Sequence, residues 1–111
     1  MGALSAQKIN WPELARVAKY SAKRMAEIRG RSVRQLEREF LRRFRQTPEE
    51  WINDLRLRDA RELLEQRNGE KIEAIAMSLG YKHYASFSRA FKQFHGASPS
   101  QIGPRLNAIW K

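Results

Sequence analysis

The chain has 111 residues, of which 41% are hydrophobic, so it can form one small domain or two very small lobes with a hydrophobic core. Its 22 lysines and arginines outnumber 12 aspartates and glutamates, and the net charge of +10 favours polyanions such as nucleic acid or an anionic membrane surface. Without cysteine, a disulfide framework and thiolate metal sites are excluded. No stretch could span a bilayer and no signal-peptide core is visible, so a cytoplasmic location is expected.

Caps and helical periodicity predict three helices in the first part of the chain. Residues 1–10 have no periodicity and are expected to form a flexible N-terminus. A first helix is predicted from Trp11, and Ser21 caps a second that ends at Gly30. Ser32 caps a third helix, which has arginines on its outer side. The inner stripe predicted for this third helix consists of Val33, Leu36, Phe40 and Phe44.

A long connecting helix is predicted over residues 48–68. Thr47, Pro48 and Glu50 provide an N-cap, a proline at the first helical position and a capping-box glutamate, and Asn68 and Gly69 end the helix. No segment alternates like a strand. The predicted fold is therefore all-α, with about seven helices.

Two shorter helices and a terminal helix are predicted after Gly69. Gly80 ends the first of them, the next begins near His83, and Ser98 and Pro99 open a terminal helix that includes Ile102. Leu106, Ile109 and Trp110 are expected to continue the terminal helix. The inner stripe predicted for the helix after His83 consists of Phe87, Ala90, Phe91 and Phe94.

The two halves of the chain repeat one plan. A spacing of fifty positions relates Ala22, Met25, Ala26 and Gly30 to Ile72, Ile75, Ala76 and Gly80. A spacing of fifty-one relates Leu36, Arg38, Phe40 and Pro48 to Phe87, Arg89, Phe91 and Pro99. Both halves have the helix, glycine turn, helix pattern of a helix-turn-helix. The predicted domains are a first helix-turn-helix subdomain (11–47), the connecting helix (48–68), a second helix-turn-helix subdomain (69–108) and a C-terminal end (109–111).

The most specific motifs are INDLRLRDARELL in the connecting helix and IEAIAMSLGYKHYASFSRAFKQFHGASPSQI in the second half. With them, roughly residues 11–108 resemble the DNA-binding domain of the AraC/XylS family of bacterial transcription regulators. The first half departs from the family pattern in three places. Arg31 stands where the family usually has an apolar residue, Arg29 stands opposite Leu79, and Arg45 replaces the glycine matched by Gly96.

The resemblance implies sequence-specific binding of double-stranded DNA by a transcription regulator, with the second helix of each half in successive major grooves. Arginine can pair with guanine and glutamine with adenine through two hydrogen bonds. Glu37 has two open roles, accepting from cytosine or pairing with a neighbouring arginine. The residues expected to contact bases are Arg34, Gln35, Arg38, Tyr84, Ala85, Ser88 and Arg89. Those expected to contact phosphates are Arg42, Arg45, Lys82, Ser86 and Lys92.

Two other functions are compatible with the charge. The main alternative is a nucleic-acid-binding or nucleoid-architectural module without sequence preference. Its binding affinity would depend steeply on salt concentration but would not differ between sequences. A cationic membrane-surface protein is disfavoured by the complete core stripes and caps, so no membrane partner is expected. No nucleophile with a base is visible, and His83 and His95 lack ligands at metal spacing, so neither enzymatic activity nor a cofactor nor a metal is expected.

The expected partners follow from the resemblance. They are double-stranded DNA and, for a bacterial regulator associated with the nucleoid, RNA polymerase as a second candidate. Two reading helices in one chain would let a monomer bind an asymmetric site. A dimer would need a domain outside this chain.

Overall fold

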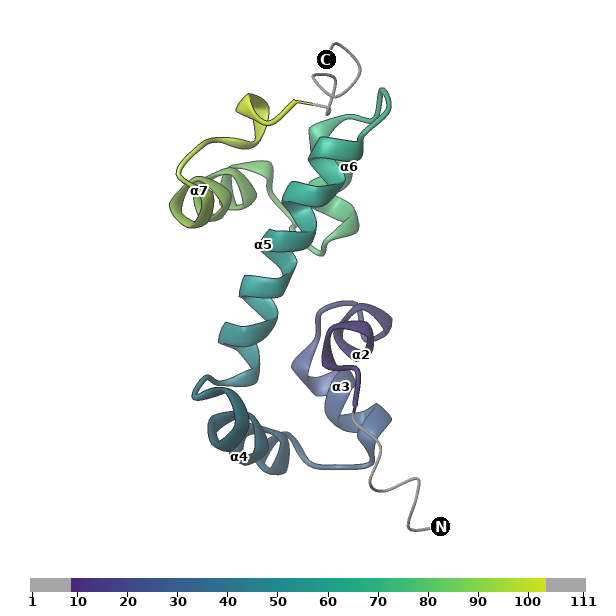
Figure 1. Cartoon of the computed structure of the whole chain (residues 1–111). Coiled ribbons are helices and arrows are strands. Elements are labelled where there is room, and N and C mark those ends of the chain that lie inside the picture. The colour runs from purple at the N-terminus through teal and green to yellow at the C-terminus, as the bar shows by residue number, and fades with distance from the viewer. Residues whose placement is uncertain (1–8, 104–111) are drawn as a thin grey trace. The chain divides into compact units, whose positions relative to one another are not determined.

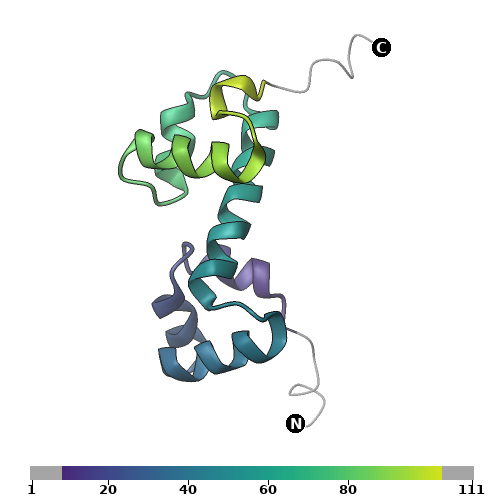
Figure 2. The ribbon, with the colours of Figure 1, turned by 90° about the vertical axis from the view of Figure 1, so that its left-hand side faces the viewer.

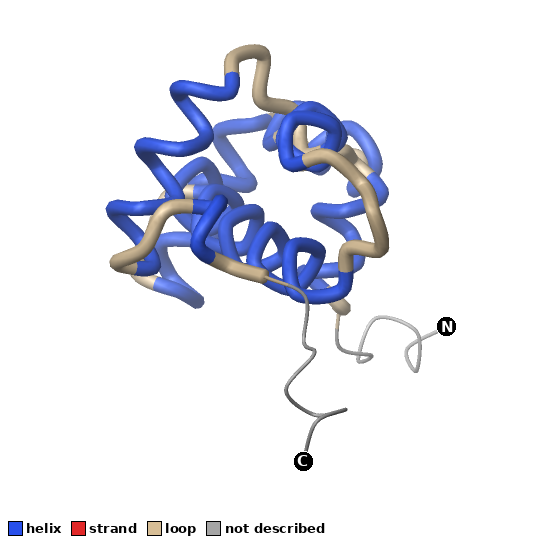
Figure 3. Tube along the Cα trace, turned by 90° about the horizontal axis from the view of Figure 1, so that it is seen from above, coloured by secondary structure: helices blue, strands red, loops and turns tan. Residues whose placement is uncertain are grey.

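The computed structural model describes residues 9–103, and within that range every regular element is a helix (Figure 3). The all-α prediction is therefore confirmed. Most of the segment predicted as a flexible N-terminus lies outside the described residues. The elements are α2 (Trp11–Val17), α3 (Ala22–Arg29), α4 (Val33–Phe44), α5 (Pro48–Gln66), α6 (Ile72–Ser78), α7 (Tyr84–His95) and the 3-10 helix η1 (Pro99–Gln101).

The chain divides into two compact units within α5, the first ending at Ile52 and the second beginning at Asn53 (Figure 1). α2, α3 and α4 belong to the first unit, and α6, α7 and η1 belong to the second. α5 ends at Gln66, slightly before the predicted end at Asn68. Each unit contains one helix-turn-helix, formed by α3 and α4 in the first unit and by α6 and α7 in the second.

An aromatic cluster forms the core of the first unit, where α3 packs against both α2 and α4. Trp11 and Phe40 meet edge to face with ring centroids 4.9 Å apart, and Trp51 lies 5.4 Å from Phe40. Such edge-to-face pairs add to the stabilisation from burying apolar area. Phe40 is completely buried, but Val33 is 36% exposed, so the prediction that it lies on the inner stripe is wrong. Val33 is the first residue of α4, and the buried residues of this helix begin one turn later, at Leu36.

The second unit has a core of phenylalanines, with α7 packed against α6 and η1 (Figure 2). Phe87 and Phe91 are completely buried, and their ring centroids are 5.6 Å apart. Phe94, which the periodicity placed on the same stripe, is 39% exposed, so the prediction is wrong there. Phe94 lines an open depression of about 190 Å³ together with Leu57 of α5 and Ala90, so α5 leaves this part of α7 uncovered.

Helix starts and stops follow the predicted caps. The Ser21 hydroxyl accepts from the Arg24 amide at 3.2 Å, and α3 ends at Gly30, whose φ of 69° is left-handed. At the start of α5, the Glu50 amide donates to the Thr47 hydroxyl at 3.2 Å, and the Thr47 amide donates to the Glu50 carboxylate at 3.0 Å. These bonds satisfy amides that have no partner within the first helical turn.

The predicted terminal helix is the main departure from the expected fold. After Ser98, only the 3-10 turn η1 forms, and the backbone of Ile102 is extended. The Ser98 amide donates to the Gln101 side-chain oxygen at 2.8 Å, so the cap is present although the helix is short. Gly103 follows at once, and glycine disfavours helix continuation. Leu106, Ile109 and Trp110 lie outside the described residues.

Candidate nucleic-acid interface

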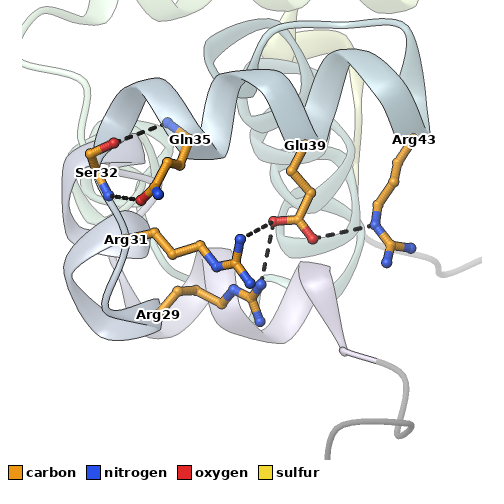
Figure 4. A network of polar contacts seen from close by, with 6 residues as sticks. All are labelled: Arg29, Arg31, Ser32, Gln35, Glu39 and Arg43. Carbon is orange, nitrogen blue, oxygen red and sulfur yellow. Dashed lines mark hydrogen bonds and ion pairs between the residues drawn. The ribbon is translucent and has the colours of Figure 1, made fainter.

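The second helix of the first helix-turn-helix, α4, begins with a reciprocal capping box. The Gln35 amide donates to the Ser32 hydroxyl at 3.1 Å, and the Ser32 amide donates to the Gln35 side-chain oxygen at 2.9 Å (Figure 4). This cap fixes the start of the helix. It also uses the side-chain oxygen with which Gln35 would accept from adenine. Base contact by Gln35 remains a prediction, and in this conformation its side-chain NH₂ group makes no contact within the capping box.

A row of arginines occupies the outer face of α4. Arg34, Arg38 and Arg42 are four residues apart, so they lie on one side of the helix, and all three are exposed. Arg45 follows as the C-cap, exposed and with a left-handed φ of 58°. Within residues 9–103, none of these arginines pairs with a carboxylate, and half-buried Glu37 forms no ion pair. The row therefore presents uncompensated positive charge.

A different set of arginines surrounds Glu39, which is only 6% exposed. Its Oε1 lies 3.3 Å from Nη2 of Arg29, at the end of α3, and 4.0 Å from Nη1 of Arg31, in the turn. Its Oε2 lies 3.4 Å from Nε of Arg43, one helical turn further along α4 (Figure 4). The Arg29 guanidinium also lies over the Trp11 ring, 5.2 Å from its centroid. We call these four residues, Glu39 with Arg29, Arg31 and Arg43, the Glu39 network.

The Glu39 network is not among the features predicted from the sequence, although the duplication contains a signal for it. Three of its members occupy positions whose counterparts in the second unit are uncharged. When one copy of a duplication has charged residues of opposite sign at several positions that are uncharged in the other copy, those residues are expected to pair with one another. The counterparts are Leu79 for Arg29, Ala90 for Glu39 and Phe94 for Arg43.

The corresponding helix of the second unit, α7, has a less basic outer face. It starts after His83, whose backbone is extended and whose side chain makes no capping bond. Ala85, Arg89 and Lys92 follow helical spacing on one side and are exposed. α7 contains no acidic residue, so both of its cations are uncompensated within the helix. Of the remaining predicted contact residues, Lys82 in the turn, Tyr84 and Ser86 are exposed, whereas Ser88 is half-buried.

The turn between α6 and α7 is held by an aromatic contact. The Arg56 guanidinium of α5 lies over the Tyr81 ring, 4.9 Å from its centroid, and the ring lies 5.2 Å from that of Phe87. Burial raises the pKa of the Tyr81 hydroxyl, and the nearby Arg56 charge acts in the opposite direction. Gly80, with φ of 95°, provides the left-handed conformation before Tyr81. These contacts fix the position from which α7 begins.

The histidines have ordinary structural environments. Nε2–H of His95 donates to the Leu57 carbonyl at 2.8 Å. His83 is exposed before α7. The part of the chain that the structure describes contains no group of three potential metal ligands. None of the helices in that part is long and apolar enough to cross a membrane.

Comparisons with known proteins agree with the helix-turn-helix geometry. A family model described as a helix-turn-helix domain matches residues 25–104. Over 54 residues, or 49% of the chain, the sequence is 43% identical to the raffinose operon transcriptional regulatory protein RafR of Pediococcus pentosaceus. The match spans only 19% of that relative's length.

Two solved structures are similar over most of the chain. One is a transcriptional regulator from Chromobacterium violaceum described as AraC-type, with 28% identity, a TM-score of 0.67 and coverage of 76% of each chain. The other is the C-terminal domain of AraT, a response regulator from Geobacillus stearothermophilus. It has 26% identity and a TM-score of 0.64, with 80% of this chain and 82% of that chain covered.

Proposed function

Because the chain belongs to the AraC-type helix-turn-helix family of DNA-binding transcription regulators, we propose that it reads a specific double-stranded DNA sequence with α4 and α7. Each helix enters a major groove, which is about 12 Å wide and admits one α-helix. The observation that carries the proposal is the matched pair Arg38 and Arg89. They occupy equivalent places in the duplication, and both are exposed without a carboxylate partner among residues 9–103.

The proposed division of labour follows from side-chain chemistry. Arg34, Arg38 and Arg89 donate to guanine, which offers two acceptors in the major groove. Ala85 contacts a thymine methyl group, and Gln35 contributes its NH₂ group. Tyr84 and Ser88 complete the base contacts. The phosphate contacts, from Arg42, Arg45, Lys82, Ser86 and Lys92, hold the protein in register without specifying sequence.

The proposed partners are double-stranded DNA and, for a regulator of transcription, RNA polymerase. Since one chain contains two helices of this kind, a monomer suffices for an asymmetric site. Dimerisation through a domain outside this chain would double the site. The family is one of DNA-binding domains rather than a class of enzymes.

Selection from a randomised duplex pool tests the proposal and returns the binding site. We expect an enriched motif with two blocks of sequence about ten base pairs apart, the spacing of successive major grooves on one face of DNA. Arg38→Ala should erase part of one block, and Arg89→Ala should erase part of the other. Retained, salt-sensitive binding with no enriched sequence would instead support the architectural alternative.

A further inference from the structure

The Glu39 network joins α3 to α4 in the first unit, and its central carboxylate is buried. We propose that Glu39 and Arg29 are positioning residues, which set the direction in which α4 presents its arginines and thereby the sequence that the first unit selects. This inference rests on the proposed function. It concerns two residues whose side chains are mostly buried.

The Arg29–Glu39 contact is the buried centre of the network. The side chain of Arg29 is 19% exposed and that of Glu39 is 8% exposed, whereas Arg31 and Arg43 are about half exposed. Arg29 is further held by the Trp11 ring. The pair therefore joins α3, α4 and the aromatic core through groups that have little freedom to move.

The chemistry of the contact makes it directional. A charge-assisted hydrogen bond has a preferred distance and angle, whereas apolar contact stabilises a range of helix orientations. In the second unit the equivalent positions are Leu79, Ala90 and Phe94, so its helices meet without such a bond. The orientation of α4 relative to α3 consequently depends on Glu39. The orientation of α7 relative to α6 has no such dependence on Ala90, the equivalent residue.

The link from Glu39 to the DNA runs through the helix itself. Arg38 is the preceding residue and is exposed, while Glu39 is buried against α3. Consecutive helical residues point about 100° apart, so a small rotation of α4 at Glu39 moves the Arg38 and Arg34 side chains together. Bidentate pairing with guanine tolerates little displacement, and rotation of α4 therefore reduces discrimination between bases.

The experiment compares the motifs selected by the wild-type chain, Glu39→Gln and Glu27→Gln. Glu27→Gln is the matched control because it removes the same charge from an exposed position on α3. We expect Glu39→Gln to lose roughly tenfold discrimination in the block that Arg38→Ala erases, and to leave the block that depends on Arg89 unchanged. Glu27→Gln should keep both blocks. An unchanged motif, or equal weakening of both blocks, would overturn the inference.

A second variant covers the case in which Glu39→Gln does not fold. The triple substitution Arg29→Leu, Glu39→Ala and Arg43→Phe installs the uncharged set of the second unit. We expect it to show wild-type helical circular dichroism and to relax the α4 block alone. A wild-type motif from this folded variant would refute the positioning role. If the wild-type chain itself enriched no sequence, the proposed function would fail, and the inference would fail with it.

Discussion

The first and second units have the same helix-turn-helix plan but stabilise it with different chemistry. In the first unit, Ser21 and Ser32 cap the two helices, and the Glu39 network joins them. In the second, the corresponding N-caps are Lys71 and His83, neither of which makes a side-chain capping bond. The shared feature is the aromatic core. The comparison indicates that the core determines the fold, while caps and ion pairs adjust each unit separately.

The outer faces of the two units differ as well. α4 has three arginines in a row, whereas α7 has Ala85 at the position matched to Arg34. Under the proposed function, the first unit contributes more of the sequence discrimination because arginine distinguishes guanine strongly, while alanine offers only apolar contact. We therefore expect the unit that matches the family motifs less closely to be the more selective one.

The largest expected effect tests whether the two cores are equivalent. Phe40→Ala and Phe87→Ala should each lower the free energy of unfolding by about 3 to 5 kcal/mol, because both side chains are fully buried and leave cavities. Calorimetric melts of the two variants measure this. Phe94→Ala is the control and should cost less than about 1 kcal/mol, since Phe94 is partly exposed. A small loss of unfolding free energy for either Phe40→Ala or Phe87→Ala would contradict the equivalence of the two cores.

The next effect sharpens the difference between base and phosphate contacts. Arg38→Ala and Arg89→Ala should each cost about 1 to 3 kcal/mol of specific binding and relax the preference at one base pair. Lys92→Ala should weaken binding to all sequences alike and reduce the slope of log K against log salt by about 1. Titrations of specific and scrambled duplexes at several salt concentrations distinguish the two patterns. Identical behaviour of the three variants would contradict the assignment.

A smaller effect concerns the residues that end α4 and α7. Arg45 has the left-handed conformation that Gly96 has in the second unit, and this conformation disfavours any residue with a β-carbon. Arg45→Gly should raise the free energy of unfolding by about 1 kcal/mol while weakening DNA binding through the lost charge. Gly96→Ala should lower it by a similar amount, although nothing lies within 4 Å of the added carbon. Destabilisation by Arg45→Gly, or stabilisation by Gly96→Ala, in thermal melts would contradict this account.

The smallest effect tests the difference in capping. Ser32→Ala removes the hydroxyl that accepts from the Gln35 amide, while the backbone amide that donates to the Gln35 side chain remains, and the change should cost about 1 kcal/mol. His83→Ser should stabilise the second unit by up to about 1 kcal/mol, because the backbone of His83 already has the extended conformation of a capping serine. Chemical denaturation measures both changes. Stabilisation by Ser32→Ala would show that the capping box contributes nothing.

Local features were predictable from the sequence, and features that depend on distant residues were not. The Thr47 cap and the Gly30 turn involve neighbours within a few positions, so their residue types alone predict them. The exposure of Phe94 depends on how far α5 covers α7, which the periodicity of α7 does not contain. The Glu39 network joins residues from two helices and a turn, and only the comparison of the two halves gives a signal for it. The contact residues follow from the family resemblance and from the helix faces on which they lie, and their roles stay predictions.

The most direct test of the account is dimethyl sulfate protection on the selected DNA site. This reagent methylates guanine N7 in the major groove, where the proposed arginine contacts occur, and adenine N3 in the minor groove. We predict two groups of protected guanines about ten base pairs apart, with Arg38→Ala exposing one group and Arg89→Ala exposing the other. Guanine N7 atoms that stay reactive throughout the bound site would contradict the proposal that α4 and α7 read the major groove.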